Sequence, residues 1–151
     1  MIKQIIQDQY RSKIDQLIDI KQISRPKEGW IRTLRKALGM SGPQLATRLD
    51  VSKSQASQME RMEIEDLITI KQLRRVADTL DCDLFYALVP RQSVDSMIRD
   101  RAKLKAEQLV SKTDVQMKLE AQQLSSEKLQ EQVKFETERL VREMPRDLWA
   151  D

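Results

Sequence analysis

Residues 41–61 read SGPQLATRLDVSKSQASQMER, and they decide the fold that the sequence predicts. The pattern Ser-x-x-Gln occurs twice, at 41–44 and at 52–55, and each copy opens an apolar run with helical spacing. In this pattern the serine hydroxyl accepts a hydrogen bond from a free backbone amide, and the glutamine reaches back to the serine amide. Because only Asp50 and Val51 separate the two predicted helices, these helices must cross steeply, as in a helix-turn-helix. An unrelated pair of antiparallel helices fits the periodicity equally well.

Further helices are predicted on both sides of this stretch. Residues 30–38 have helical spacing up to Gly39, and a third capping pattern, Thr-x-x-Gln, begins at Thr69. The inward faces of the two central helices would be small or aliphatic: Leu45, Ala46 and Leu49 on the first, and Val51, Ala56 and Met59 across the turn and on the second. We therefore expect a small helical bundle built around these faces.

The segment DLFYALV, residues 83–89, follows the last of these helices and ends before Pro90. Its bulky side chains predict either a strand or a buried helix end. A lone strand is unstable in water, so a strand here needs a partner, and the same segment of a second subunit is the obvious one. We expect a short dimerising strand at these residues.

Both ends of the chain are predicted to be helical. Residues 2–20 place several isoleucines near one face, and residues 21–28 are expected to form a linker. Residues 93–144 contain neither glycine nor proline, and breaks predicted at 111–114 and at 125–126 divide them into two or three amphipathic helices. The expected fold class is all-α, with three parts: an N-terminal helix and linker (1–28), a helix-turn-helix domain (29–90) and a helical C-terminal extension (91–151).

The composition excludes most familiar enzymes. The 151 residues include no histidine, one cysteine and three glycines. An imidazole base, a disulfide framework, a thiolate zinc site and a glycine-rich phosphate loop are therefore all ruled out. We expect no enzyme activity, no metal and no cofactor. No run of 18 apolar residues and no signal-peptide core is present, so we expect a cytoplasmic protein without a membrane span.

Charge is segregated within the central region. Residues 31–61 carry six basic side chains against two acidic ones, a local charge of +4. Residues 62–90 carry three basic side chains against six acidic ones, a local charge of −3. A basic stretch beside an acidic one favours a single phosphate-facing side. Ordinary mixing of surface charges is the alternative.

The helix-turn-helix geometry assigns roles to individual residues, because the second helix enters the major groove with its N-terminal end at the base edges. The predicted base-reading residues are polar and lie at that end: Lys53, Ser54, Gln55, Ser57 and Gln58. The predicted phosphate contacts are basic or lie at a helix start: Arg32, Arg35, Lys36, Ser41, Gln44, Arg48 and Arg61. The predicted dimer or partner contacts are apolar: Leu84, Phe85, Tyr86, Leu88, Val94 and Ile98.

The pattern LA-x-x-L-x-VS-x-S-x-x-S-x-x-E, at residues 45–60, resembles the Xre family of lambda-repressor-like helix-turn-helix domains, and the resemblance extends over 29–90. It implies a DNA-binding regulator. Three residues depart from the family pattern. Gly42 stands where the family usually has a glutamine that touches DNA, and Asp50 and Met62 stand where it usually has glycine.

Almost the whole chain resembles the mobile mystery protein A family. The similar segments are RPKEGWIRTLRKALGMS (25–41), LRRVADTLDCDLFYALVPRQSVDSMIRDRA (73–102) and the final Leu148-Trp149. The resemblance implies a bacterial regulator found with a Fic-domain partner, mobile mystery protein B, in a toxin–antitoxin or mobile-element module. Two functions then compete: a dimeric repressor of its own operon, and an antitoxin or adaptor that binds and inhibits a protein partner through its helical extensions.

A short motif near the linker concerns that partner. The letters Ser24-x-x-x-Glu28-Gly29 fit a motif that blocks Fic enzymes. That motif must be helical, and Pro26 is poorly placed in the interior of a helix. A chance match is therefore the preferred interpretation.

Overall fold

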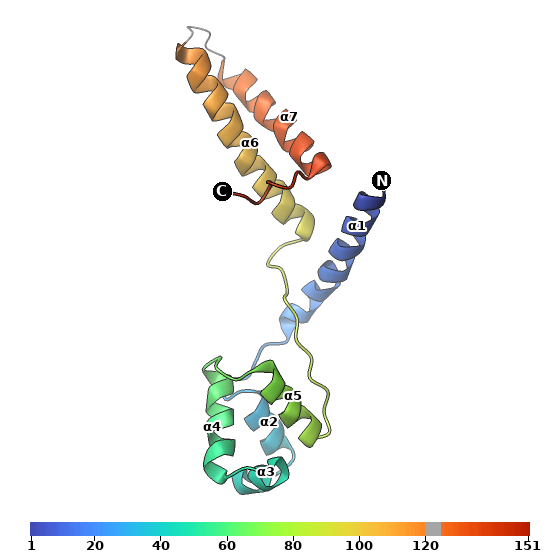
Figure 1. Cartoon of the computed structure of the whole chain (residues 1–151), viewed down its shortest axis with the longest axis vertical. Coiled ribbons are helices and arrows are strands. Elements are labelled where there is room, and N and C mark those ends of the chain that lie inside the picture. The colour runs from blue at the N-terminus through green and yellow to red at the C-terminus, as the bar shows by residue number, and fades with distance from the viewer. Residues whose placement is uncertain (120–124) are drawn as a thin grey trace. The chain divides into compact units, whose positions relative to one another are not determined.

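The computed structural model describes residues 1–119 and 125–151 (Figure 1). Its α-helices are α1 (Ile2–Asp15), α2 (Trp30–Ala37), α3 (Gly42–Leu49), α4 (Lys53–Ile64), α5 (Ile70–Thr79), α6 (Val94–Leu119) and α7 (Ser126–Glu143). A 3-10 segment, Gln16–Gln22, continues α1. The described residues contain no strand, and the predicted all-α class is confirmed. None of the described helices has the length and apolar character of a membrane span.

The chain divides into two compact units, which we describe separately. One comprises residues 20–87 and contains α2 to α5. The other comprises residues 1–19 together with 88–151, and contains α1, α6 and α7.

Three capping boxes start α3, α4 and α5 where the sequence predicts them. The hydroxyls of Ser41, Ser52 and Thr69 each accept a hydrogen bond from the amide three residues later. The glutamine at that later position accepts a hydrogen bond from the amide of the capping residue. These reciprocal bonds satisfy two backbone groups that a helix start leaves free. All three predicted helix starts are confirmed.

The turn between α3 and α4 depends on a residue in the left-handed conformation. Asp50 has φ 56 and ψ 47 and ends α3. The amide of Asp50 donates to the Thr47 carbonyl at 3.2 Å, and the amide of Val51 donates to the Ala46 carbonyl at 3.0 Å. This pair of bonds is a Schellman motif. Aspartate tolerates the left-handed conformation better than most residues do, so the turn closes without the usual glycine.

The core of the 20–87 unit joins all four of its helices. It contains six buried side chains: Ile31, Leu45, Leu49, Met59, Val76 and Leu80. Val51 packs against this cluster, and the small residues Ala46 and Ala56 are also buried, each 2% exposed. The predicted inward faces of the two central helices are therefore confirmed. Their burial leaves the opposite face of α4 to solvent.

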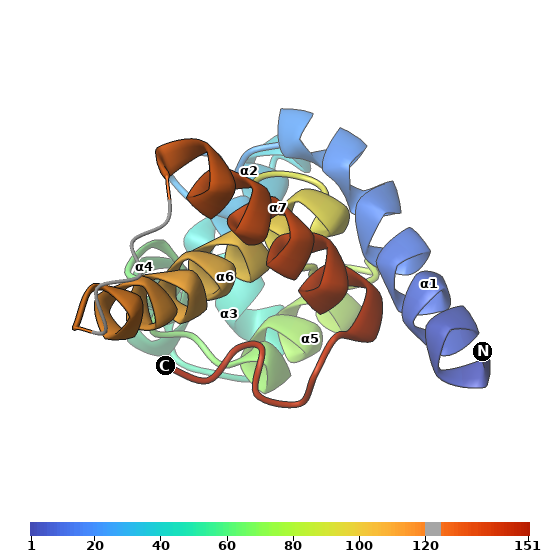
Figure 2. The same ribbon diagram turned by 90° about the horizontal axis from the view of Figure 1, so that it is seen from above.

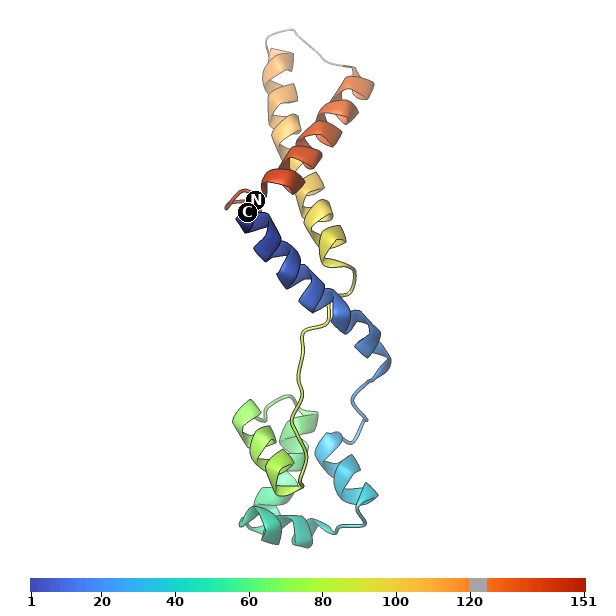
Figure 3. The same cartoon turned by 90° about the vertical axis from the view of Figure 1, so that its right-hand side faces the viewer.

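In the second unit, α6 and α7 run side by side in opposite directions (Figures 1 and 3). Ala102 and Ala106 on α6 are fully buried, and such small side chains let two helices approach closely. Ile98, Leu140 and Leu148 complete the buried cluster. Leu148 belongs to the C-terminal segment, which α6 holds because Arg101 Nε donates to the Leu148 carbonyl at 2.7 Å.

The expected breaks in the C-terminal extension have different outcomes. The break at 111–114 is wrong, because α6 continues through these residues and Thr113 bonds within the helix to the Leu109 carbonyl at 3.1 Å. The break at 125–126 is confirmed, since the Ser125 hydroxyl caps α7 by accepting from the Lys128 amide at 3.3 Å.

The polar side of α1 faces the start of α6 in the same unit. Arg11 donates to Asp95 at 3.0 Å, and Asp15 accepts a hydrogen bond from the Val94 amide at 3.1 Å. No residue of α1 is buried, and its large apolar side chains are exposed: Ile2, Ile5, Ile6, Tyr10 and Ile14. Figure 2 shows α1 beside the helical hairpin that α6 and α7 form. The helix predicted over 2–20 is α-helical only as far as Asp15.

Residues 83–89 do not form the predicted strand. They make no ladder with any described segment, and Figure 3 shows them within an extended connection. The predicted dimerising strand requires the same segment of a second subunit, so a single chain does not test it and it stays a prediction.

Candidate DNA-binding surface

α4 presents a polar face at its N-terminal end. The residues of that face are all exposed: Lys53, Ser54, Gln55, Ser57 and Gln58. Ala56 and Met59, which are 2% and 8% exposed, point into the core instead. Because Ala56 and Met59 face the core, the opposite side of α4, which carries all five predicted base-reading residues, faces solvent.

The two glutamines of this face are not equivalent. Gln55 Oε1 accepts a hydrogen bond from the Ser52 amide at 3.0 Å, so its acceptor is already engaged in the cap of α4. Gln58 makes no side-chain hydrogen bond with any described residue. A bidentate contact with adenine uses both the donor and the acceptor of a glutamine. Gln58 is therefore better placed than Gln55 for such a contact.

Two of the predicted phosphate contacts hold a buried carboxylate. Glu60 on α4 is 5% exposed. Arg35 Nε donates to Glu60 Oε1 at 2.6 Å, and Arg32 Nε donates to Glu60 Oε2 at 3.0 Å. Arg35 also donates to the Met40 carbonyl at 3.0 Å. Both side chains tie α2 to α4 through Glu60, and their predicted contact with phosphate stays a prediction.

The electrostatics of this cluster favour the charged forms of Glu60 and Arg35. Burial raises the pKa of Glu60, but hydrogen bonds from Arg35 and Arg32 outweigh burial, and the net shift of the Glu60 pKa is downward. The pKa of Arg35 is raised, chiefly by its hydrogen bond to Glu60. Two guanidinium groups against one carboxylate leave one net positive charge beside α4.

The other basic residues of the predicted set lie at the surface. Arg48 and Arg61 are exposed and form no ion pair within the described ranges. Lys36 Nζ donates to Glu28 at 2.6 Å, and both side chains are substantially exposed. Exposed pairs of this kind are weak and are screened by salt, so Lys36 is free to exchange partners.

A hollow lies where α2, the start of α3 and the polar face of α4 meet. It is lined by Arg32, Arg35, Lys36, Gly42, Pro43, Lys53, Ala56, Ser57 and Glu60. Beside it, Ser41 and Gln44 are exposed and bonded to each other in the cap of α3. The free amides at that helix start add positive potential. This corner combines the exposed residues that are predicted to read bases with positive charge, as a DNA-binding surface requires.

Glu63 fixes the start of α2 behind this surface. Its carboxylate, 4% exposed, accepts hydrogen bonds from the amides of Trp30 at 2.7 Å and Ile31 at 2.8 Å. Gly29 has φ 83, and a Cβ there would lie 2.9 Å from a Glu63 oxygen. Sequence reasoning missed this cap, because the carboxylate and the amides it caps are more than 30 residues apart and follow no local pattern.

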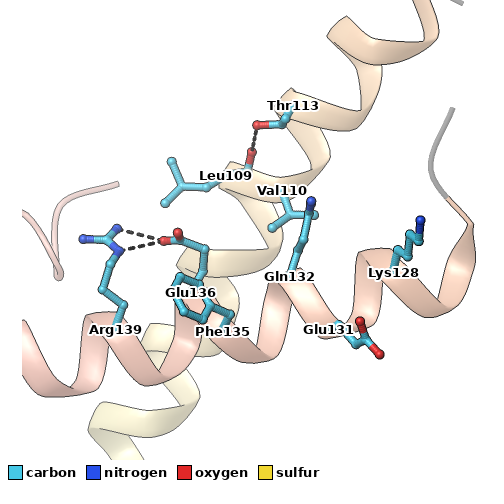
Figure 4. A pocket seen from close by; sticks show the side chains of 9 residues that line it. All are labelled: Leu109, Val110, Thr113, Lys128, Glu131, Gln132, Phe135, Glu136 and Arg139. Atoms are coloured by element: carbon cyan, nitrogen blue, oxygen red, sulfur yellow. Dashed lines mark hydrogen bonds and ion pairs between the residues drawn. The ribbon is translucent and has the colours of Figure 1, made fainter. Parts of the chain in front are cut away.

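The hairpin carries a hollow of a different character (Figure 4). Leu109 and Phe135 line it and are 39% and 68% exposed. Arg139 at its edge is held by Glu136 at 2.8 Å. The lining has two basic residues, Lys128 and Arg139, and two acidic ones, Glu131 and Glu136, so it offers no surplus positive charge for phosphate.

The predicted dimer and partner contacts fall into two groups. Phe85, Tyr86 and Leu88 are exposed, and Leu84 is half-buried. Ile98 is 6% exposed in the core formed by α6 and α7, and Val94 packs against that core, so the structure accounts for both side chains within one unit. Their apolar stripe is covered by other residues of the same unit.

Comparison with known proteins supports the assignment of the α2–α5 unit. Residues 31–86 match the family described as Helix-turn-helix (HTH_3). No curated protein and no solved structure matches the chain. The matched range contains the capped α3 and α4 and the polar face of α4. Residues 31–86 are thus a helix-turn-helix domain of the Xre, lambda-repressor-like type, the domain of DNA-binding transcriptional regulators.

Proposed function

We propose that this chain is a sequence-specific repressor that binds an operator upstream of its own operon. The observation that carries the proposal is the polar N-terminal face of α4, exposed behind a capped turn. The resemblance to mobile mystery protein A adds a Fic-domain protein as the product of the same operon. A cytoplasmic location and a homodimer that matches a two-fold symmetric operator belong to the same proposal.

In this proposal α4 enters the major groove and divides the work between two kinds of contact. Gln58 binds adenine in bidentate fashion, while Lys53 at the helix start donates to guanine. Arg48 and Arg61 bind phosphates, which fix the position of α4 without reading sequence. Arg32 and Arg35 act indirectly, because they hold Glu60 and thereby the orientation of α2 against α4.

Base reading is tested by titrating the upstream DNA and a shuffled control duplex at several salt concentrations. The Gln58→Ala variant should lose about 1–3 kcal/mol on the operator and much less on the shuffled duplex. Gln130→Ala, an exposed glutamine on α7, is the matched control and should bind like the wild type. Equal losses on both duplexes would reduce Gln58 to a positioning contact, and no loss on either would remove α4 from the interface.

Phosphate contact is tested by comparing arginines in different settings. Arg48→Ala should weaken binding to both duplexes and lower the salt slope by about one unit. Arg35→Ala should chiefly lower the free energy of unfolding, because Arg35 is bonded to Glu60 and to the Met40 carbonyl. An unchanged salt slope for Arg48→Ala and for Arg61→Ala would leave these side chains outside the interface.

A second candidate function, an antitoxin or adaptor, is favoured by α1. This helix exposes Ile2, Ile5, Ile6, Tyr10 and Ile14 while its polar side faces its own unit. An exposed apolar stripe of this kind is typical of a protein-binding surface. The Fic-domain protein is the proposed occupant, from the family resemblance. Residues 24–29 do not add support, because they lie outside any helix.

Co-purification tests this second role. Full-length protein should retain the co-expressed Fic-domain protein, and Ile6→Asp should abolish retention without changing operator binding. Gln9→Asp, an exposed position on the same helix, introduces the same charge as a control. Failure of full-length protein to retain the partner would leave α1 without this role.

A further inference from the structure

The backbone of residues 83–92 forms no hydrogen bond with the part of the chain that the structure describes. The turn after α5 ends with the Cys82 amide, which donates to the Ala77 carbonyl at 2.8 Å. The next backbone hydrogen bond along the chain joins the Met97 amide to the Ser93 carbonyl at the start of α6. Between them, no amide or carbonyl bonds to any described residue. An extended segment with free amides and carbonyls is a template for pairing with another strand.

The side chains of this segment are apolar and exposed. Phe85 is 68% exposed, Tyr86 63% and Leu88 89%. Large apolar and aromatic side chains in an extended chain are usually packed against another segment of protein. In a strand, Leu84, Tyr86 and Leu88 would share one face, and Phe85 and Ala87 the other. The segment therefore has both the backbone and the side chains of a strand that lacks a partner.

We propose that residues 83–89 pair in antiparallel fashion with the same residues of a second copy, with Tyr86 on the two-fold axis. This register places Leu84 opposite Leu88 of the second copy, and Phe85 opposite the small Ala87 of the second copy. Apolar and aromatic cross-strand pairs of this kind stabilise a sheet. The two-fold axis makes every contact occur twice, as in other symmetric dimers.

Charges at the two ends of the segment select the antiparallel orientation and a second copy as the partner. Asp81 and Asp83 precede the apolar residues, Arg91 follows them, and all three are exposed. Asp81 has φ 57 and belongs to the turn that ends the α5 region, so it lies outside the strand. The proposed register places Arg91 diagonal to Asp83 of the second copy, on the same face and within reach of a long side chain. A parallel pairing would place like charges together and is disfavoured.

The strength of this pairing is limited, because a two-stranded ribbon alone is marginally stable in water. We expect a reversible dimer that the operator strengthens, since two linked recognition helices raise the effective concentration of each other on DNA. The inference deepens the proposed function by naming the surface that joins two helix-turn-helix units. Its test uses no DNA, so the two proposals can fail separately.

Cysteine crosslinking tests the register in the full-length chain, with Cys82→Ser as the background. In that background Tyr86→Cys should form a disulfide-linked dimer on mild oxidation, because the two copies of residue 86 face each other. Leu84→Cys and Leu88→Cys should each fail alone, since identical residues would lie four positions, or roughly 13 Å, apart. A mixture of the two variants should crosslink. Gln130→Cys on the hairpin is the control for random collision.

Charge reversal tests the orientation by sedimentation equilibrium. Arg91→Glu should raise the dissociation constant of the dimer about tenfold, and adding Asp83→Lys should restore most of the loss. Arg142→Glu, an exposed charge on α7, is the control and should leave dimerisation unchanged. A dimer in which Tyr86→Cys does not crosslink, or Leu84→Cys crosslinks with itself, would overturn the proposal. A protein that stays monomeric in sedimentation equilibrium would overturn it too, whereas a crosslinked dimer that fails to bind the operator in a separate titration would count only against the repressor.

Discussion

The buried carboxylate of Glu60 gives the sharpest test of how the DNA-binding surface is supported. The Glu60→Gln substitution keeps the size of the side chain and removes its charge. Glu60 accepts from Arg35 Nε at 2.6 Å, from the second Arg35 nitrogen at 3.3 Å and from Arg32 Nε at 3.0 Å. A glutamine has only one acceptor oxygen, and its amide group would point donor to donor at one of the guanidinium groups.

The expected loss follows from the exposure of the three groups. Removing one partner of a fully buried ion pair costs about 3–5 kcal/mol, because an uncompensated charge stays buried. Here the Arg35 and Arg32 side chains are 14% and 31% exposed, so each guanidinium can turn partly to water. We therefore expect Glu60→Gln to lower the free energy of unfolding by about 2–3 kcal/mol at pH 7.

The pH dependence adds a second, independent signature. The folded-state pKa of Glu60 is lower than its ordinary value, so its stabilising contribution is complete above the unfolded pKa of about 4.3. This contribution is lost as the pH falls from there through the lower folded-state pKa. The stability difference between wild type and Glu60→Gln should be constant between about pH 6 and 8 and should shrink below about pH 4.

Urea unfolding followed by circular dichroism measures both quantities. Glu65→Gln, an exposed carboxylate just after the last residue of α4, is the matched control and should change stability by less than about 0.5 kcal/mol. A Glu60→Gln variant as stable as this control at pH 7 would refute the reasoning. So would a stability difference that persists unchanged at acid pH.

Three further substitutions test other parts of the structure. Gly29→Ala should destabilise the 20–87 unit by about 2 kcal/mol in urea unfolding, because its φ is positive and the new Cβ would displace the Glu63 carboxylate from the start of α2. Gly42→Gln should leave stability nearly unchanged, since nothing lies within 4 Å of the added Cβ, and should raise operator affinity by about 1 kcal/mol in a DNA titration. Leu148→Ala removes a side chain that is 1% exposed, and it should lower protection of the α6 and α7 amides from hydrogen exchange by about 2–4 kcal/mol without changing operator affinity.

Local rules predicted the parts of the fold that local chemistry determines. The three capping boxes lie within four residues each, so the sequence contains all the partners of each helix start. The inward faces of α3 and α4 follow from spacing alone. The predicted break at 111–114 failed because serine and threonine lower helix propensity only slightly, and packing of α6 against α7 overrides that preference.

Contacts between distant residues could not be predicted in this way. Glu60 lies 25 and 28 residues from its two arginines, and no periodicity marks such a triad. The orientation of α1 was also beyond the sequence, because an apolar stripe predicts a buried face. In the structure, Arg11 and Asp15 bind the start of α6 instead and turn that stripe outward. The base-reading residues were placed correctly on one exposed face, but exposure does not test contact with DNA, and their role stays a prediction.

The Glu60 triad also changes how the charge of the surface is interpreted. The local charge of +4 over residues 31–61 counts Arg32 and Arg35 as equal to Arg48 and Arg61. Pairing with Glu60 does not alter that sum, but it removes two guanidinium groups from the set that can release counterions from phosphate. In the proposed complex, the positive field over α4 would steer DNA toward it, while specific positioning would depend on Arg48 and Arg61. The buried Glu60 therefore converts part of a basic patch into a support that fixes α2 against α4, and this support holds the predicted base-reading face of α4 in place.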